Sequence, residues 1–347
     1  MTGPIAIAIS GGIDSLVAAA LLKEQGHAVF AVHFLSGYEN SKALASSSAK
    51  ALGRALDLPV FVIDLAEPFK KKVVDYFTSA YQQGETPNPC LVCNPSIKFG
   101  VLLKEARQRG ASHLATGHYA RVERDSSGLY RLRKGMDAAK DQSYFLAHLT
   151  QKQLARACFP LGTWTKEQVR AYARDNGLMP VTRSESQDVC FIRDTSYADF
   201  IEQVGGTVSR PGEIVDAAGR RVGSHNGLHR YTVGQRRGIN IPASRAYYVI
   251  RLDTRHNRLV VGFKEDTYSS GCRVRDVNWI TGEPEEPLKA DTRIRYRHKA
   301  AASIVAADEQ RGANVHFDQP QASVTPGQGA VFYRGDEVVG GGWIENS

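Results

Sequence analysis

The 347-residue chain lacks a long apolar run, is poor in cysteine and contains no low-complexity tract or internal repeat. Its first apolar run covers only residues 5–9, against the roughly 18 residues of a membrane span, and it lacks the basic segment of a secretory signal. Five cysteines in such a chain indicate reactive or metal-binding thiols rather than a disulfide framework. These absences predict a soluble, cytoplasmic protein that does not contact a membrane.

The composition is that of a folded protein with a mild positive charge. Apolar residues make up 42% of the chain and charged residues 23%, which suffices for real cores and differs from a disordered composition. The formal net charge is +8, which weakly favours a polyanionic partner such as nucleic acid. The length predicts two or three domains.

The first part of the chain alternates strand and helix patterns. Strands are predicted at residues 5–9, 28–34, 60–63 and 113–116. Helices are predicted at residues 16–24, 41–55, 97–109, 151–158 and 166–176. Strands separated by helices indicate a parallel sheet with helices on both faces, and ligands of such sheets bind at the carboxyl ends of the strands.

From about residue 208 the sequence becomes rich in Gly, Val and short strand patterns. Residues 247–252 are predicted to pair with residues 258–263, and the chain from Val274 onward is predicted to be purely β. We therefore predict an α/β fold with three parts. These are a catalytic parallel-sheet domain at residues 1–200, a small β-rich linker domain at 208–266 and a C-terminal β-barrel at 270–347.

Residues 10–15, Ser-Gly-Gly-Ile-Asp-Ser, connect the first predicted strand to the first predicted helix. Paired glycines let backbone N–H groups approach a phosphate, the helix N-terminus adds its positive end, and the serines offer hydroxyls. The loop is not a Walker loop, which would end in Gly-Lys-Ser/Thr. Asp14 fits an anion site if Mg²⁺ joins it or if it caps the helix. An ordinary glycine-rich turn is the alternative for the loop taken alone.

Three cysteines stand in recognisable surroundings. Cys90 and Cys93 form a Cys-x-x-Cys pair in a proline-rich loop, and Cys190 lies in the segment Ser-Gln-Asp-Val-Cys-Phe-Ile, which begins at residue 186. The pair could be half a zinc site completed by His113 or His118, but a second cysteine pair is lacking. A thioredoxin-like dithiol does not fit a proline-rich loop. The remaining cysteines, Cys158 and Cys272, have no motif around them and are expected to be packed thiols.

The phosphate loop resembles the PP-loop of N-type ATP pyrophosphatases, which split ATP into AMP and pyrophosphate to activate a carbonyl oxygen. Over essentially its whole length the chain is similar to the tRNA-specific 2-thiouridylase family (MnmA/TrmU). The resembling segments are residues 8–15, 86–94, 97–99, 116–119, 140–146, 159–162, 190–192, 231–238 and 295–296. The resemblance implies a PP-loop (adenine nucleotide α-hydrolase-like) catalytic domain and a tRNA-uridine 2-sulfurtransferase. That enzyme thiolates C2 of the wobble uridine of tRNA, using ATP and Mg²⁺.

The resemblance also implies roles for individual residues. ATP would bind at Ala8, Ile9, Ser10, Gly11, Gly12, Ile13, Asp14, Ser15, Phe34 (where the family usually has Met) and Gly117. The target base would meet Asn88 and Pro89, and the tRNA would contact Lys140, Asp141, Gln142, Arg295 and Tyr296. Cys190 would carry a persulfide, and Cys93 would assist and end disulfide-bonded to it.

The implied chemistry is coherent, because a uracil C2 oxygen is a very poor leaving group until it is adenylated. Sulfur then has to arrive as a persulfide or sulfide nucleophile. A cysteine desulfurase with a persulfide relay, or free sulfide, would be the sulfur donor. The candidate catalytic residues are therefore Asp14, Cys90, Cys93 and Cys190.

Cys90 departs from the family pattern, because many members have Asp at this position. The thiolates of Cys90, Cys93 and Cys190 could together hold a [4Fe–4S] cluster and leave one iron open for hydrosulfide. The hypothesis of a cluster is an alternative to the persulfide and disulfide route.

A run of alternating cations, Arg293, Arg295, Arg297 and Lys299, would lie on one face if residues 293–299 formed a strand. Four like charges on one strand favour contact with tRNA phosphates, although a solvated face is the alternative. Arg236 and Arg237 suggest the same contact more weakly. Two competing functions stay open: a PP-loop enzyme with another substrate, such as an amide-forming synthetase or a thiolase of another tRNA position, and a non-catalytic tRNA-binding or iron–sulfur scaffold protein.

Overall fold

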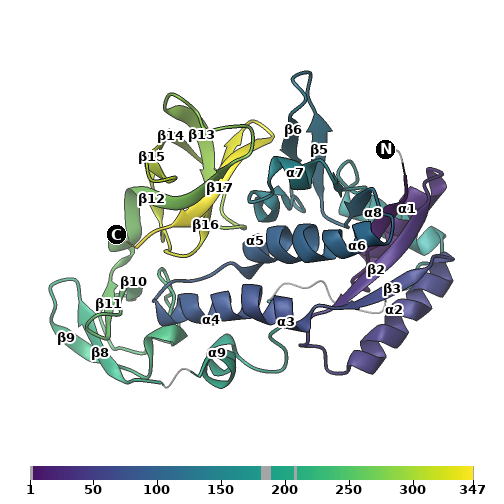
Figure 1. The fold of residues 1–347 in the computed structure, drawn as a ribbon. Helices are drawn as coiled ribbons and strands as arrows, with labels where there is room; N and C mark the ends of the chain where they lie inside the picture. Colours follow the sequence, from purple (N-terminus) through teal and green to yellow (C-terminus); the bar gives the residue numbers. More distant parts are fainter. Residues whose placement is uncertain (1–2, 181–188, 207–208, 347) are drawn as a thin grey trace. The chain divides into compact units, whose positions relative to one another are not determined.

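The computed structural model describes residues 3–180, 189–206 and 209–346, and it divides into two compact units (Figure 1). Unit 1 comprises Met1–Val73, Cys90–Phe191 and Asp336–Val339. Unit 2 comprises Val74–Pro89, Ile192–Gly335 and Gly340–Ser347. Each unit is described by itself.

Unit 1 is built on a parallel sheet with the strand order β3-β2-β1-β4-β7. Its strands are β1 (Ile5–Ala8), β2 (Val29–Leu35), β3 (Val60–Asp64), β4 (His113–Ala115) and β7 (Ala157–Cys158). Ile5 pairs with Val29 on one side and with His113 on the other, so β1 is central. The strand order therefore reverses between β1 and β4, and the carboxyl ends of these two strands form the switch point where such sheets bind ligands.

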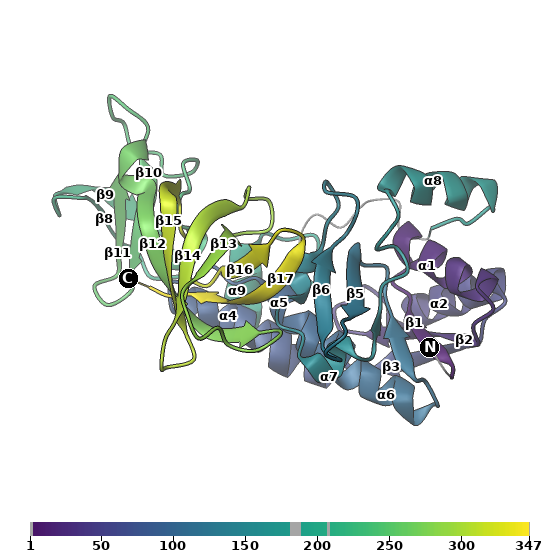
Figure 2. The same cartoon turned by 90° about the horizontal axis from the view of Figure 1, so that it is seen from above.

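Three helices cover one face of this sheet, as Figure 2 shows. They are α1 (Ile13–Glu24), α2 (Lys42–Leu56) and α8 (Lys166–Asp175). Ile5 and Ile7, which point to the same face at strand period two, share a buried core with apolar residues of all three helices. This packing fixes the N-terminal turns of α1 and α8 with respect to β1.

The helical run of residues 89–108 belongs to the opposite face. It consists of α5 (Pro89–Cys93), the π-helix η2 (Asn94–Leu102) and α6 (Leu103–Gln108). Proline suits the first helical position because its missing N–H would have no partner there. Rare π-helical hydrogen bonding often marks functional sites, and here it begins directly after Cys93.

The remaining elements of unit 1 lie around this framework. They are α3 (Ala66–Phe69), η1 (Lys70–Val74), β5 (Ala120–Arg124), β6 (Tyr130–Lys134), η3 (Ser143–Leu146) and α7 (Gln151–Leu154). Strands β5 and β6 form an antiparallel hairpin, and Arg131 on β6 makes ion pairs of 2.7 Å with Asp125 and Glu337.

Unit 2 contains a small helical pair and a small sheet. Helices α4 (Asp75–Gln82) and α9 (Tyr197–Gly205) are joined by aromatic contacts, including the stacked rings of Tyr81 and Tyr197 at 5.3 Å. The sheet has the order β10-β11-β8-β9. Its elements are β8 (Gly212–Asp216), β9 (Arg221–His225), η4 (Leu228–Arg230), β10 (Tyr248–Asp253) and β11 (Arg258–Gly262).

The C-terminal part is a closed antiparallel barrel, since β12 pairs with both β15 and β17. Its elements are η5 (Lys264–Thr267), β12 (Tyr268–Trp279), β13 (Leu288–Arg293), β14 (Ala301–Ala307), β15 (Ala313–Ala322), β16 (Gly329–Arg334) and β17 (Glu337–Ile344). The predicted α/β fold with a parallel sheet followed by a C-terminal barrel is confirmed.

Some local predictions are wrong. The helix predicted at residues 151–158 ends at Leu154, and Cys158 lies in the edge strand β7. The strand predicted to carry four cations ends at Arg293, and the chain then bends and turns. Because that arginine stacks on the Tyr333 ring at 5.2 Å, only Arg295, Arg297 and Lys299 of the run are exposed.

Candidate functional site

The phosphate loop follows β1 directly and lies at the switch point of the sheet. Gly11 has a φ of +85°, a conformation open mainly to glycine, which lets the chain turn sharply between strand and helix. The Ser15 hydroxyl donates to the Gly12 carbonyl at 2.9 Å, and the Ser10 N–H donates to the Ser15 hydroxyl at 3.2 Å. His33 on β2 bonds the Ile9 carbonyl through Nδ1 at 2.8 Å. The loop is thus a fixed structure rather than a loose connection.

Gly117 lies against this loop from the end of the neighbouring strand. A Cβ atom built on Gly117 would be 2.9 Å from both the Asp14 carbonyl carbon and the Ser15 nitrogen. Real Cβ atoms do not approach backbone so closely, so only glycine fits without a shift. Two predicted ATP-binding segments, residues 8–15 and Gly117, therefore meet at the carboxyl ends of β1 and β4.

Asp14 has partners that the sequence analysis missed. Lys166 Nζ lies 2.8 Å from both carboxylate oxygens of Asp14, and the Tyr119 hydroxyl donates to Oδ1 at 2.7 Å. The Asp14 side chain is 32% exposed and that of Lys166 only 7%. The N-cap of α1 is Gly12, so the alternative that Asp14 caps the helix is wrong.

A sequence signal for Lys166 did exist. Thr165 and Gln168 form a capping box that makes Lys166 the first residue of α8. A cation is unfavourable at the positive end of a helix, so a lysine at this position indicates a reason other than helix stability.

Cys190 is positioned by its neighbour Phe191, which is buried among aromatic rings of unit 1. The Phe191 ring lies 5.7 Å from that of Phe69 and 5.9 Å from that of Tyr38. Phe34, the predicted ATP contact on β2, is 6.3 Å from the same Phe69 ring. Residues 186–188 of the Cys190 motif lie outside the described residues.

The three motif cysteines share one electrostatic environment. Cys93 is buried, and the pKa of its thiol is raised to about 12, mainly by burial. Cys90 keeps an exposed surface, yet the protein atoms around its sulfur raise its pKa to about 11 through desolvation. A negative charge on Cys190 raises the pKa of both thiols, and the cation of Lys98 lowers both. These mutual effects indicate that Cys90, Cys93, Cys190 and Lys98 lie close together.

Lys98 is held beside a neutral histidine. Its Nζ donates to His118 Nε2 at 3.4 Å, and His118 Nδ1 lies 2.7 Å from the Thr116 hydroxyl. Burial, and then the charge of Lys98, lower the pKa of His118 well below its usual value. Because an ammonium can only donate, Nε2 accepts and Nδ1 carries the proton. His118 therefore serves as an acceptor for Lys98.

A metal site finds no support in this arrangement. Among residues 3–180, 189–206 and 209–346, no three Cys, His, Asp or Glu side chains are grouped so that they could hold a metal ion. The hypothesis of a [4Fe–4S] cluster on the three cysteines is therefore not supported by the described residues. A zinc site on the Cys-x-x-Cys pair with His113 or His118 fails for the same reason.

In the predicted tRNA-contacting segment, residues 140–142, the side chains of Asp141 and Gln142 hydrogen-bond to the protein's own backbone. Asp141 is 4% exposed, and its Oδ1 accepts from the backbone N–H groups of Gly135 and Ser143, both at 3.1 Å. Gln142 accepts from the Tyr119 N–H through Oε1, and its own N–H donates to the Tyr119 carbonyl. Asp141 is thus inaccessible to a ligand, and Gln142 fixes the tyrosine that contacts Asp14.

Asn88 and Pro89 belong to unit 2, whereas Cys90 begins the next segment of unit 1. The loop before them is tied within unit 2, where the Thr86 N–H donates to the Pro326 carbonyl at 2.8 Å. Gln328 Nε2 also donates to the Thr86 carbonyl at 2.9 Å. Pro89 is buried and Asn88 half-buried.

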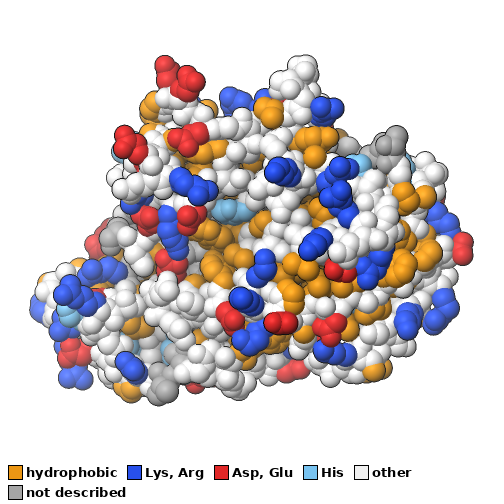
Figure 3. All heavy atoms as spheres, viewed as in Figure 1, with side chains coloured by type: hydrophobic (Ala, Val, Ile, Leu, Met, Phe, Trp, Pro, Cys, Tyr) orange, Lys and Arg blue, Asp and Glu red, His pale blue; other side chains and the backbone are white. Residues whose placement is uncertain are grey.

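Exposed cations mark unit 2. Figure 3 shows Lys and Arg side chains gathered over the β8–β11 sheet, with fewer acidic side chains among them. Arg236 and Arg237 are exposed on a turn that the Gln235 side chain fixes, since its Nε2 donates to the Arg237 carbonyl at 2.8 Å. Arg295 is also exposed, and Tyr296 half-buried.

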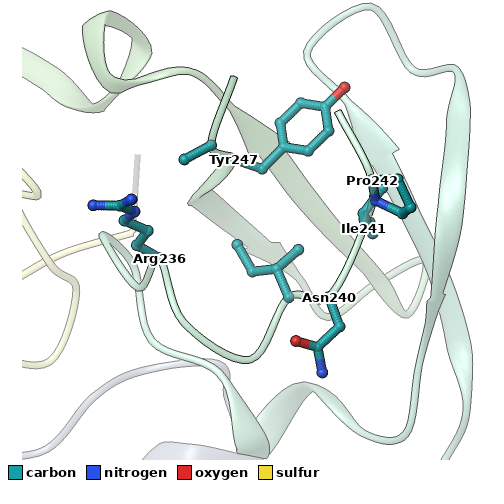
Figure 4. Close-up of a pocket in the computed structure, with 7 residues that line it drawn as sticks. Arg236, Asn240, Ile241, Pro242 and Tyr247 are labelled. Atoms are coloured by element: carbon teal, nitrogen blue, oxygen red, sulfur yellow. The ribbon is translucent and has the colours of Figure 1, made fainter. Parts of the chain in front are cut away.

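Arg236 lies at one side of a pocket whose other walls are mostly apolar. Figure 4 shows the Tyr247 ring above it and Pro242 on the side opposite Arg236. The lining residues are Arg236, Ile239, Asn240, Ile241, Pro242, Ala246 and Tyr247.

No helix among the residues described is long and apolar enough to span a membrane.

Comparison with known proteins places the whole chain in a family. Residues 4–194 match a tRNA methyl transferase HUP domain, residues 198–263 a tRNA methyl transferase PRC-barrel domain, and residues 269–344 an aminomethyltransferase beta-barrel domain. A protein of Desulfosudis oleivorans named tRNA-specific 2-thiouridylase MnmA is 52% identical over 340 residues, covering 98% of this chain and 94% of that protein. A protein of Geotalea uraniireducens with the same name is 45% identical over 356 residues, covering 99% and 95%.

Among solved structures, the U34-tRNA thiolase NcsA from Methanococcus maripaludis with its [4Fe-4S] cluster is 19% identical and has a TM-score of 0.36. The match covers 59% of this chain and 64% of the NcsA chain. A likeness this weak carries no argument about cofactors.

Proposed function

The chain belongs to the tRNA-specific 2-thiouridylase family, and from that premise we propose that it is a tRNA sulfurtransferase that replaces the C2 oxygen of the wobble uridine by sulfur. The observation that carries the proposal is the sequence identity of 52% and 45% to relatives of that name, over 98% and 99% of this chain. The presence of a phosphate loop and three neighbouring cysteines in one compact unit supports it further. The phosphate loop favours sulfur transfer over methyl transfer, because methyl transfer does not require adenylation of the uridine.

The phosphate loop would carry out the adenylation. We propose that Mg²⁺–ATP binds along residues 8–15 and Gly117, with Phe34 near the nucleotide, since these segments meet at the switch point of the sheet. The uridine C2 oxygen attacks the α-phosphate, the bond to the β-phosphate breaks, and pyrophosphate leaves with the electron pair. The product is an adenylated uridine whose C2 oxygen has become a good leaving group.

The cysteines would carry out the sulfur transfer. We propose that the Cys190 thiolate attacks the outer sulfur of a donor persulfide, such as that of a cysteine desulfurase relay, and the donor leaves as its thiolate. Free sulfide, the other predicted donor, would instead attack C2 of the adenylated uridine directly, because it cannot form a persulfide without an oxidant. The Cys93 thiolate attacks the inner sulfur of Cys190, the S–SH bond breaks, and the hydrosulfide so released attacks C2 of the uridine. AMP then leaves with the former C2 oxygen, and a Cys93–Cys190 disulfide remains that a two-electron reductant must reopen.

The partner would be tRNA. Exposed cations such as Arg236, Arg237 and Arg295 support contacts with phosphates. Within residues 140–142, Lys140 is proposed to contact RNA, because it is a half-buried cation whereas Asp141 is buried. Asn88 and Pro89 are proposed to meet the target base, and a tRNA substrate supports a cytoplasmic location.

The proposal is tested with purified protein, unmodified tRNA, Mg²⁺–ATP and a sulfur donor, followed by nucleoside mass spectrometry. We expect 2-thiouridine at the wobble position only when ATP is present. Thiolation at another position would favour the alternative substrate, and tRNA binding without any ATP-dependent product would favour a scaffold protein. Either result would overturn the proposal.

A further inference from the structure

The phosphate loop contains one charged residue, and that residue is negative. Residues 10–15 carry the Asp14 carboxylate and no lysine or arginine, unlike a Walker loop, whose lysine meets the phosphates. Mg²⁺–ATP is itself an anion. A bare carboxylate in this loop would repel it, so the charge of Asp14 has to be balanced.

Lys166 balances that charge from a distant part of the chain. Its ammonium lies 2.8 Å from each carboxylate oxygen of Asp14, which is an ion pair with both oxygens engaged. The Lys166 side chain is 7% exposed, and lysine is almost never so buried unless it is paired. Solvent reaches the ion pair mainly at the Asp14 carboxylate, whose side chain is 32% exposed.

The stability of α8 does not explain this lysine. Lys166 is the first residue of α8, where the helix dipole disfavours a cation, whereas Asp14 stands in the first turn of α1, where an anion is favoured. Burying a charge is also costly, and a buried ion pair is weak support for stability. The arrangement therefore points to the anion site that it borders.

Further contacts hold the pair in one geometry. The Lys166 N–H donates to Asp137 Oδ2 at 2.9 Å, which fixes the start of α8. The Tyr119 hydroxyl donates to Asp14, and hydrogen bonds with Gln142 fix the backbone of that tyrosine. Helices α1 and α8 share one apolar core, which fixes the backbones that carry the two charged side chains.

We propose that Lys166 is a positioning residue of the ATP site, which neutralises Asp14 and orients its carboxylate so that the loop accepts Mg²⁺–ATP. This inference rests on the proposed use of ATP. On this proposal, Lys166 acts on the nucleotide through Asp14 and does not itself contact the phosphates.

The test is a double-mutant cycle on the dissociation constant of Mg²⁺–ATP, measured by titration calorimetry on the full chain without tRNA. Lys166→Met leaves Asp14 uncompensated, and we expect it to raise the dissociation constant about 10- to 100-fold, the usual worth of a charged hydrogen-bonded contact. In an Asp14→Asn background, the same Lys166→Met change should alter the constant less than about threefold, because no charge is left to neutralise.

Lys23→Met is the matched control, since it removes a lysine in the last turn of α1 that is paired with Asp57 at 2.9 Å; we expect less than about a threefold effect. Melting temperatures of all variants show whether a loss of binding is a loss of fold. An unchanged constant in Lys166→Met overturns the inference, as does an equal loss in both backgrounds, which would mean that Lys166 acts on the phosphates directly. Failure of the wild-type chain to bind Mg²⁺–ATP overturns the proposed function as well.

Discussion

The Cys93 thiol lies in surroundings that keep it protonated near neutral pH. Burial raises its pKa to about 12, and only the nearby Lys98 acts in the other direction. A thiolate, not a thiol, is the nucleophile that attacks a persulfide. The proposed reaction therefore requires Cys93 to lose its proton when substrate or persulfide is bound, and the charge of Lys98 favours that loss.

Alkylation of Cys93 should follow this pKa. Because its pKa of about 12 lies above the accessible range, we expect the iodoacetamide rate to rise about tenfold per pH unit from pH 7 to 10 without levelling off. Lys98→Met removes the charge that lowers the pKa, so alkylation should be slower at every pH. The rate is measured by mass spectrometry of the Cys93 peptide.

Lys42→Met is the control, since Lys42 is paired with Asp64 and lies on α2, and the rate should stay unchanged. A plateau near pH 8 in the wild-type chain would show that the thiol is not held protonated as described.

Loss of either transfer cysteine should stop thiolation without stopping ATP binding. We expect Cys93→Ser and Cys190→Ser each to lower 2-thiouridine formation by roughly a thousandfold or more, as losses of catalytic nucleophiles do. Cys272→Ala, in the C-terminal barrel, should retain activity, because Cys272 is half-buried in β12 and remote in the sequence from the motifs. Full activity of Cys190→Ser would refute its role as the persulfide carrier.

The residue scale also shows what a sequence can and cannot predict. Asp14 and the motif cysteines could be proposed from the sequence because each stands in a short motif, and their roles stay predictions. Lys166 could not be paired with Asp14, because the two are 152 positions apart and meet only through the packing of α8 on α1. The capping signal at Thr165 predicts where α8 starts, but it does not predict that Lys166 lies beside Asp14.

At the scale of elements, the segment from Gly135 to Ser143 acts as a frame for the site. Asp141 holds both of its ends through backbone N–H groups, and Gln142 holds Tyr119. The resemblance to the family marks this segment for tRNA contact. In the structure Asp141 and Ser143 are buried, whereas Lys140 and Gln142 are half-buried.

Substitutions in this segment should separate folding from RNA binding. Asp141→Ala leaves two backbone donors without their acceptor, so we expect the free energy of unfolding to fall by about 2 kcal/mol or more in urea titrations. Lys140→Ala should leave that free energy within about 0.5 kcal/mol and weaken tRNA binding instead. The opposite pattern would mean that Asp141 contacts the tRNA and Lys140 supports the fold.

Element predictions failed where pattern and packing disagreed. Residues 151–158 have helical composition, yet Ala157 and Cys158 add to the sheet edge because they pair with Leu114 and Ala115. The β5–β6 hairpin was missed, since it is an insertion in an otherwise alternating βα pattern. The bounds of β1 were predicted to within one residue, because a short continuous apolar run is typical of a strand buried on both faces of a parallel sheet.

At the scale of the whole molecule, the compact units do not follow the order of the chain. Residues 336–339 lie in unit 1 although residues 337–339 begin the last strand, and residues 74–89 lie in unit 2. We retain the three-part division at residues 1–200, 208–266 and 270–347 as a proposal. Long-range pairings such as that of Glu337 with Arg133 could not be predicted from local patterns.

The exposed arginines of the small sheet unit should contribute to tRNA affinity through charge. We expect a double Arg236→Ala and Arg237→Ala variant to bind tRNA more weakly at low salt and to lower the salt dependence of log K by about 1 to 2. Arg220→Ala is the control, because Asp216 already balances the charge of Arg220 at 2.8 Å. Filter binding across salt concentrations checks this, and equal slopes for all three proteins would contradict it.

The central claim is that the uridine C2 oxygen is adenylated before sulfur replaces it. It is tested most directly with a tRNA transcript whose uridines carry ¹⁸O at C2, incubated with Mg²⁺–ATP and a sulfur donor. The account predicts one ¹⁸O atom in AMP for each 2-thiouridine formed, since the oxygen leaves on the α-phosphate. Formation of 2-thiouridine with unlabelled AMP would contradict it.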